Sequence, residues 1–176
     1  MRYFFITIIL FFLTLTFYTC SNSKTIPHPQ IINGVLDLKN WDFSSNGVIS
    51  LSGTWEFYWE KLLTSKDFKN PDMQLNPKLI KIPHVWTDFE IDGKYLPKDG
   101  YATYRLVLLL DKQYSSPLAF KIFELATAFS LYVNGKKVTS SGIVSTSPQS
   151  HKSEWRPHIA IFSPESRKIE IIIHVS

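Results

Sequence analysis

The sequence lacks several features on which simple functional assignments rest. It contains one cysteine, so an intrachain disulfide is impossible. No run of five or more basic residues occurs, and the lysines behind the formal net charge of +4 are interspersed with acidic residues, so nucleic-acid binding is not expected. A Gly-x-Ser-x-Gly nucleophile motif and a glycine-rich phosphate loop are also missing. These absences disfavour nucleic-acid-binding proteins and the commonest hydrolase and nucleotide-dependent classes.

Long apolar runs are scarce, and the only one lies at the N-terminus. It extends over residues 3–18, directly after Arg2. A helix of these 16 residues would be roughly 24 Å long, which is short for a hydrocarbon core of about 30 Å. The segment is typical of a signal peptide, assigned to residues 1–20, and we expect the rest of the protein to be exported to the periplasm or the cell surface.

Cys20 follows this apolar run and precedes a polar, proline-containing linker, residues 21–32. Its position resembles the processing site of bacterial lipoproteins, in which the cysteine is lipidated and becomes the first residue. Lipid on Cys20 would hold the protein at a membrane. Phe17 and Tyr18 are bulkier than the residues such sites usually carry, so an ordinary signal peptide or an uncleaved anchor is the alternative.

Residues 33–176 have the composition of one folded domain. Hydrophobic residues make up 44% of the chain and aromatic residues 15%, enough for a substantial core. Helical periodicity is absent, apart from a turn or two expected within residues 60–68. Apolar and polar residues alternate instead, and Asn134-Gly135 is typical of a two-residue hairpin turn, so about eight short strands in an all-β sandwich are expected. The clearest strand segments are residues 54–60, 103–110, 118–125, 130–142 and 168–176.

Four motifs occur in order along this domain. They are LSGTWEFYWEKLL, IKIPHVWTDF, DGYATYRLVLLL and LYVNGKKVTSSG. Together they resemble the extracellular jelly-roll sensor domain of bacterial seven-transmembrane receptors with diverse intracellular signalling modules. More distantly, they resemble the sugar-binding jelly roll of β-galactosidase-type glycoside hydrolases. The resemblance covers about residues 33–176 and implies a jelly-roll β-sandwich like a galactose-binding domain.

The resemblance implies a non-catalytic sensor domain that binds a ligand in signalling. The receptors continue into seven membrane helices, and the glycosidases keep their catalytic carboxylates in a separate barrel domain. This sequence stops at Ser176, within the last expected strand, so we expect a truncated relative, a fragment or a stand-alone binding protein. The alternative is a membrane-tethered protein-interaction module, in which unpaired backbone near residues 169–176 would recruit a protein partner.

Aromatic and planar polar side chains are the candidates for a ligand site. A sugar requires an aromatic surface and planar polar groups, and arginine binds carboxylates through parallel hydrogen bonds, so a carbohydrate or a carboxylate is the expected ligand. The candidate residues are Trp86, Tyr101, Arg105, Trp155 and Arg156. The alternative is structural: the segment from Gly100 to Arg105 would close the jelly roll, with a side chain such as Arg105 paired to a neighbouring acid.

Other reactive groups form no recognisable centre in the sequence. Glycoside hydrolysis requires two carboxyl groups in one cleft, and Glu56 and Glu60 do not occur in such a context. The spacing of Asp88, Glu90 and Asp92 would suit Ca²⁺, although a hydrophilic loop is the simpler interpretation. The five histidines are scattered without zinc spacing. We therefore predict no enzymatic activity, no metal and no cofactor.

Overall fold

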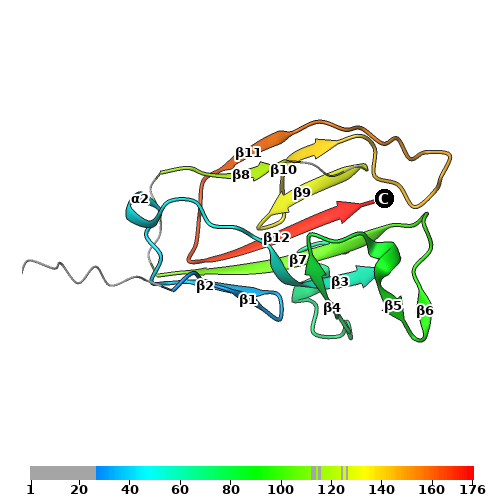
Figure 1. Ribbon diagram of the computed structural model, residues 1–176, viewed down its shortest axis with the longest axis horizontal. Coiled ribbons are helices and arrows are strands. Elements are labelled where there is room, and N and C mark those ends of the chain that lie inside the picture. The colour runs from blue at the N-terminus through cyan, green and yellow to red at the C-terminus, as the bar shows by residue number, and fades with distance from the viewer. Residues whose placement is uncertain (1–26, 112–113, 115, 124, 126) are drawn as a thin grey trace, which may run out of the picture.

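The chain forms an all-β sandwich, which confirms the fold class predicted from the alternating sequence pattern (Figure 1). The computed structural model describes residues 27–111, 114, 116–123, 125 and 127–176, so Cys20 and the expected signal peptide lie outside the described residues. Within this part of the chain the helical elements are short: α2 (Phe43–Asn46) and the 3-10 turns η1 (Asp67–Lys69) and η2 (Trp86–Asp88). None of the described helices is long and apolar enough to cross a bilayer.

The strands follow one another with turns and loops between them. They are β1 (Ile31–Ile32), β2 (Val35–Leu38), β3 (Gly53–Trp59), β4 (Lys78–Ile82), β5 (Glu90–Ile91), β6 (Lys94–Tyr95), β7 (Ala102–Leu110), β8 (Leu118–Ile122), β9 (Phe129–Val133), β10 (Lys136–Ser141), β11 (His158–Phe162) and β12 (Lys168–Val175). β9 and β10 form the hairpin expected at Asn134-Gly135, where both turn residues have positive φ.

The larger layer is an eight-stranded sheet built around β7 and β12. β12 runs antiparallel to β7, from Lys168 opposite Leu109 to Val175 opposite Ala102, and β9 pairs with the other edge of β12. The other edge of β7 pairs with β3 along its first half and, in parallel, with β2 along its second half. The expectation of unpaired backbone near residues 169–176 is therefore wrong, because both edges of β12 are hydrogen-bonded within the sheet.

The hydrophobic core lies between this sheet and a second, two-stranded sheet of β8 and β11. Leu106 and Leu108 of β7 are buried in the core, together with Ala160 and Phe162 of β11. Successive residues of a strand point to opposite faces, so Arg105 lies on the outer face of the large sheet. A slip of one residue in the pairing of β7 would exchange these two faces, and the apolar pattern therefore fixes the register.

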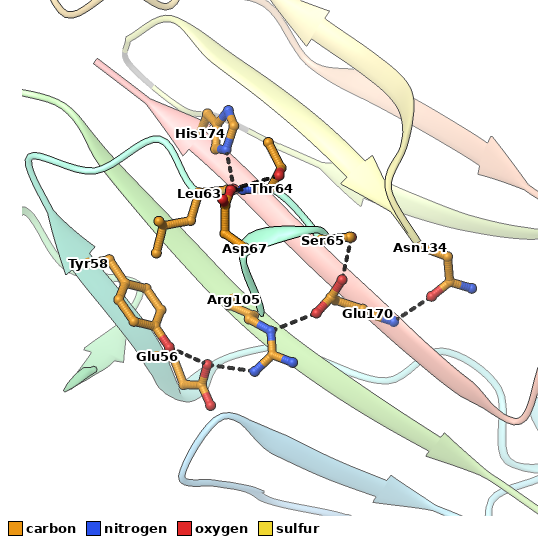
Figure 2. A network of polar contacts seen from close by, with 10 residues as sticks. All are labelled: Glu56, Tyr58, Leu63, Thr64, Ser65, Asp67, Arg105, Asn134, Glu170 and His174. Atoms are coloured by element: carbon orange, nitrogen blue, oxygen red, sulfur yellow. Dashed lines mark hydrogen bonds and ion pairs between the residues drawn. The ribbon is translucent and has the colours of Figure 1, made fainter. Parts of the chain in front are cut away.

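Residues 60–69, which we call the strap, cross the outer face of the large sheet (Figure 2). Leu63 and Ser65 of the strap are buried against that face. The helical turn expected within residues 60–68 is reduced to η1 at the end of the strap. The reason is that the backbone of Leu63 bonds to side chains of the sheet instead of to neighbouring backbone groups of the strap. Its amide donates to Thr103 and its carbonyl accepts from His174.

Gly100 precedes β7 at a point where the chain passes close to the ring of Trp59. A Cβ atom on Gly100 would lie 2.1 Å from Cη2 of Trp59, so any side chain here would displace that ring. Trp59 in turn contacts Trp86, with ring centroids 5.4 Å apart. The glycine is required for this close approach, which favours a structural role for the segment that enters β7.

Candidate functional site

Arg105 is the centre of a charged network on the outer face of the large sheet (Figure 2). Its Nη1 donates to Oε2 of Glu56 on β3, and its Nε donates to Oε1 of Glu170 on β12, both at 2.8 Å. Glu56 lies directly opposite Arg105 across the β3–β7 pair, whereas Glu170 lies diagonally across from it on β12. Three strands that are distant in sequence thus supply one arginine and two carboxylates.

Both carboxylates of this network accept a further hydrogen bond, Glu56 at the same oxygen that Arg105 binds and Glu170 at its other oxygen. The hydroxyl of Tyr58 donates to Oε2 of Glu56 at 2.9 Å, and the hydroxyl of Ser65 donates to Glu170. The side chains of Arg105, Glu56 and Glu170 are only 16%, 17% and 12% exposed. The ring of Phe68 on the strap lies over the guanidinium, with its centroid 4.4 Å from Cζ of Arg105. The network is therefore covered as well as paired.

Burial and charge set the protonation of these groups. Burial lowers the pKa of the Arg105 guanidinium, but the hydrogen bonds and charges of Glu56 and Glu170 outweigh it and raise that pKa overall, so Arg105 stays charged. Burial, followed by the nearby Glu56 carboxylate, raises the pKa of Tyr58, so its hydroxyl remains a donor. Nε and Nη1 of Arg105 are thus used internally, so neither of its parallel donor pairs is complete for a carboxylate ligand, which favours the structural interpretation of Arg105.

The strap is fixed to the sheet by two further side chains. The hydroxyl of Thr103 accepts from the amide of Leu63 at 2.9 Å and donates to the carbonyl of Lys61 at 2.6 Å. Nε2 of His174 donates to the carbonyl of Leu63 at 2.7 Å. Burial lowers the pKa of the His174 imidazole, so the ring is neutral in this position at neutral pH. These contacts make the strap part of the folded core rather than a mobile cover.

Trp86 contacts the ring of Trp59, and Tyr101 directly follows Gly100, which lies against the same ring. The indole nitrogen of Trp86 donates to the carbonyls of Pro97 and Lys98, at 3.1 and 3.3 Å. Tyr101 is half-buried, and its carbonyl accepts from the amide of Glu60 at 2.9 Å. The polar edge of Trp86 is therefore occupied by its own loop, and both residues help to hold this corner of the fold together.

Trp155 and Arg156 lie in the loop that joins β10 to β11. Trp155 is 71% exposed. Nη2 of Arg156 contacts Oε1 of Glu154 at 2.7 Å, while Oε2 of Glu154 accepts from the amide of Gly142 at 3.0 Å and closes the base of the loop. In the part of the chain that the structure describes, no hydrogen bond, ion pair or ring contact joins this loop to Trp86 or Tyr101. The five candidate residues thus lie in three separate places.

The acidic residues considered for Ca²⁺ do not converge. Oδ2 of Asp88 lies 3.0 Å from Nδ1 of His84, and Oδ1 of Asp92 lies 3.2 Å from the ammonium nitrogen of Lys78. Among the described residues, no group of three or more histidine, cysteine, aspartate or glutamate side chains is placed to hold a metal ion. The acids at Asp88, Glu90 and Asp92 fit the interpretation of a hydrophilic loop and hairpin.

A small pocket lies where β2 and β7 end, and the sequence interpretation missed it. Because these strands are parallel, with Leu38 opposite Leu110, the segments that follow them leave the sheet side by side. The pocket has a volume of about 160 Å³. Its lining residues are Lys39, Asn40, Trp41, Asp42, Asp111 and Tyr114. The polar and aromatic residues that follow each strand were visible in the sequence, but the parallel pairing that brings them together was not.

The walls of this pocket are positioned by local hydrogen bonds. The indole of Trp41 donates to the carbonyl of Gly47 at 3.2 Å, and the hydroxyl of Tyr114 donates to the carbonyl of Trp41 at 3.0 Å. Asp42 accepts from the amide of Ser44 at 2.9 Å and so caps α2. Asn40 and Asp111 are exposed at the rim. The pocket therefore combines a fixed aromatic wall with accessible amide and carboxylate groups.

Comparison with known proteins identifies solved structures that share the fold. No protein-family model matches the sequence, and no curated protein matches it significantly. Among solved structures, a β-glucuronidase of Faecalibacterium prausnitzii aligns with a TM-score of 0.52 and 16% identity over 73% of this chain and 20% of that one. A β-glucuronidase of Ruminococcus gnavus aligns with a TM-score of 0.50 and 19% identity over 72% of this chain and 21% of that one. The chain thus spans about a fifth of these enzymes and shares with them a β-sandwich fold.

Proposed function

We propose that this protein is a non-catalytic, extracytoplasmic ligand-binding domain of the sensor type, held at a membrane through its N-terminal segment. The observation that carries the proposal is the pocket at the ends of β2 and β7. Ligand sites combine an apolar or aromatic wall with a few polar groups that fix orientation, and this pocket has both. The resemblance of the four sequence motifs to receptor sensor domains supports the same function.

The size and chemistry of the pocket favour a sugar ring or a similar small polyol. Its volume of about 160 Å³ is below the roughly 300 Å³ at which pockets for drug-sized ligands begin, so it suits one ring or the end of a longer chain. Asn40 offers an amide donor and acceptor, and Asp111 offers carboxylate acceptors, which are the groups that pair with sugar hydroxyls. Tyr114, which is half-buried, supplies an aromatic surface for the apolar face of the ring, and the largely buried Trp41 closes the wall behind it.

The charged network supports a non-catalytic role. Glu56 and Glu170 share one arginine, and each accepts a further hydrogen bond, from Tyr58 and Ser65 respectively. A glycosidase needs one carboxyl group to donate a proton and a second to act as base or nucleophile in an open cleft. The alignment with β-glucuronidases over only a fifth of their length is also consistent with a domain that lacks the catalytic part.

Binding to the full chain in nanodiscs, measured by calorimetry, tests the proposal. The ligand panel contains neutral monosaccharides, uronic acids and dicarboxylates. We expect saturable binding of a neutral sugar that Asp111→Ala weakens at least about tenfold, equivalent to about 1.4 kcal/mol. The control is Asp72→Ala, which removes an exposed carboxylate from the loop between β3 and β4. Equal affinities in the two variants, or no binding across the panel, would contradict the proposed site.

A further inference from the structure

β11, in the second sheet of the sandwich, carries apolar residues on both of its faces. On β11, Ala160 and Phe162 are buried in the core, whereas Ile159 and Ile161 point away from it and are 67% and 66% exposed. A surface strand normally alternates apolar with polar residues, and a strand that is apolar on both faces is normally covered on both. The outer face of β11 therefore has the composition of a covered surface although it is open.

β8 extends this outer face alongside β11, along one margin of the molecule (Figure 1). Lys121 lies opposite Ile159, and Ala119 lies opposite Ile161. Phe123 directly follows β8 and is exposed, with the ammonium nitrogen of Lys121 4.6 Å from the centre of its ring. We define the small-sheet face by five residues: Ala119, Lys121, Phe123, Ile159 and Ile161.

The loop that leads into β11 adds the same kinds of side chain. Trp155 and Ile143 of this loop are among the exposed large apolar residues, and Lys152 is exposed as well. The carboxylate of Glu154 is already bound by Arg156 and by a backbone amide. Among the described residues of the loop and the small-sheet face, basic side chains outnumber acidic ones. The surface thus combines aliphatic, aromatic and basic groups.

We propose that the small-sheet face docks on an anionic phospholipid bilayer. Aliphatic and aromatic side chains bind at the boundary between headgroups and acyl chains, and lysine and arginine bind the anionic headgroups. Ile159, Ile161 and Phe123 supply the first contribution. Lys121 supplies the second, because its exposed ammonium group, which lies over the Phe123 ring, is on the same face as the two isoleucines. Trp155, three residues before β11, is exposed and carries the amphipathic ring that is enriched at membrane interfaces.

The chain length before the sandwich is consistent with this partner. Residue 27 is the first described residue, so residues 21–26 separate it from Cys20. These residues extend over at most roughly 20 Å, which is less than the roughly 30 Å over which the nine residues of β7 extend. With the predicted anchor at or before Cys20, the sandwich would therefore remain in contact distance of the bilayer. Only this tether argument depends on the anchor, and no part of the inference depends on the sugar pocket.

Site-specific labelling of the full chain tests the docking surface. An environment-sensitive NBD fluorophore is attached at Ile161→Cys or, as a matched control, at Leu79→Cys, an exposed apolar position on β4 of the other sheet. Any label on Cys20 is common to both proteins. In nanodiscs with about 30% phosphatidylglycerol, we expect the emission at position 161 to shift to the blue and to rise roughly twofold relative to the same protein without lipid. We expect no change at position 79.

Three results would overturn the proposal. The first is equal emission at the two positions. The second is a change at position 161 that occurs without lipid and grows with protein concentration, which would identify a second copy of the chain as the partner. The third is an unchanged blue shift and rise in emission at position 161 in a variant that combines Ile159→Ser with Lys121→Glu. Sugar binding, measured on the same samples, reports separately on the pocket and on the integrity of the fold.

Discussion

The outer face of the large sheet carries charged side chains and is covered, whereas the small-sheet face carries apolar side chains and is open. On the large sheet, Arg105, Glu56 and Glu170 lie beneath the strap with their hydrogen bonds made within the chain. On the small sheet, Ile159 and Ile161 have no such cover from the described residues. In an isolated soluble domain a covered face is normally apolar and an open face is normally polar, so each of these faces has the opposite composition.

The difference shows which face has its interactions satisfied within the chain and which face is available for association. A buried charge is tolerated only when it is paired and hydrogen-bonded, and the network around Arg105 meets that condition through three strands and the strap. Exposed apolar groups need no partner for folding, but several together mark an interaction surface. We therefore expect substitutions on the large sheet to change stability and substitutions on the small sheet to change association.

The largest effect is expected for Arg105→Met. The substitution leaves the carboxylates of Glu56 and Glu170 largely buried and without their cation, and we expect it to lower the free energy of unfolding by about 2–4 kcal/mol. Urea denaturation followed by circular dichroism measures it. The control, Lys78→Met, breaks an exposed pair with Asp92 and should cost less than about 1 kcal/mol. Equal losses in the two variants would show that burial does not distinguish the pairs.

A smaller effect is expected for Thr103→Val, which keeps the shape of the side chain but removes its hydroxyl. The amide of Leu63 and the carbonyl of Lys61 then lose their partner beneath the strap. We expect a loss of about 1–2 kcal/mol in unfolding free energy and faster hydrogen exchange confined to residues 60–69. Unchanged exchange in the strap would mean that the remaining contacts hold it without Thr103.

A weaker, pH-dependent effect is expected from His174. Burial lowers its pKa below the ordinary value of 6.5, with the carbonyl of Leu63 and the charge of Asp67 opposing the shift and Lys137 adding to it. A lowered folded-state pKa means that the unfolded chain takes up a proton first. Stability is therefore full above about pH 6.5 and declines as the pH falls through the folded-state pKa.

Unfolding curves between about pH 7.5 and pH 5 measure this decline. His174→Asn retains a donor for the carbonyl of Leu63 and cannot titrate, so its curve should be flatter over this range. Asp67, whose pKa is lowered by hydrogen bonds from Thr64, contributes only at more acidic pH. A slope that persists unchanged in His174→Asn would assign the effect to another group.

The smallest effect on stability is expected on the small sheet. Ile161→Thr removes exposed apolar surface and keeps a β-branched side chain, so the unfolding free energy should change by no more than about 0.5 kcal/mol. Ala160→Thr is the contrasting variant, because it introduces a hydroxyl at the neighbouring buried position, and it should cost at least about 1 kcal/mol. Similar losses in both would show that Ile161 is part of the folding core.

The sequence by itself determined the local elements. The nearly unbroken apolar segment at residues 103–110 and the alternating segment at residues 168–176 correspond to β7 and β12, and Asn134-Gly135 forms the expected turn. These features are predictable because a period of two and the conformational preferences of turn residues act between neighbours in the chain. The all-β class follows from the same local pattern, and so does the choice of Arg105 and its possible acidic partner.

Only the tertiary structure decided which side chains meet. The role of Arg105 depends on Glu170, 65 residues later, and the pocket depends on the parallel pairing of β2 with β7. The enclosure of β12 between β7 and β9 removed the edge that its terminal position suggested. Nor does the pattern of β11 reveal which of its faces has a cover. The physical reason is that strand order and layer packing arise from burial between residues distant in the sequence. The alternation within one strand is compatible with many arrangements, and only the complete core selects one of them.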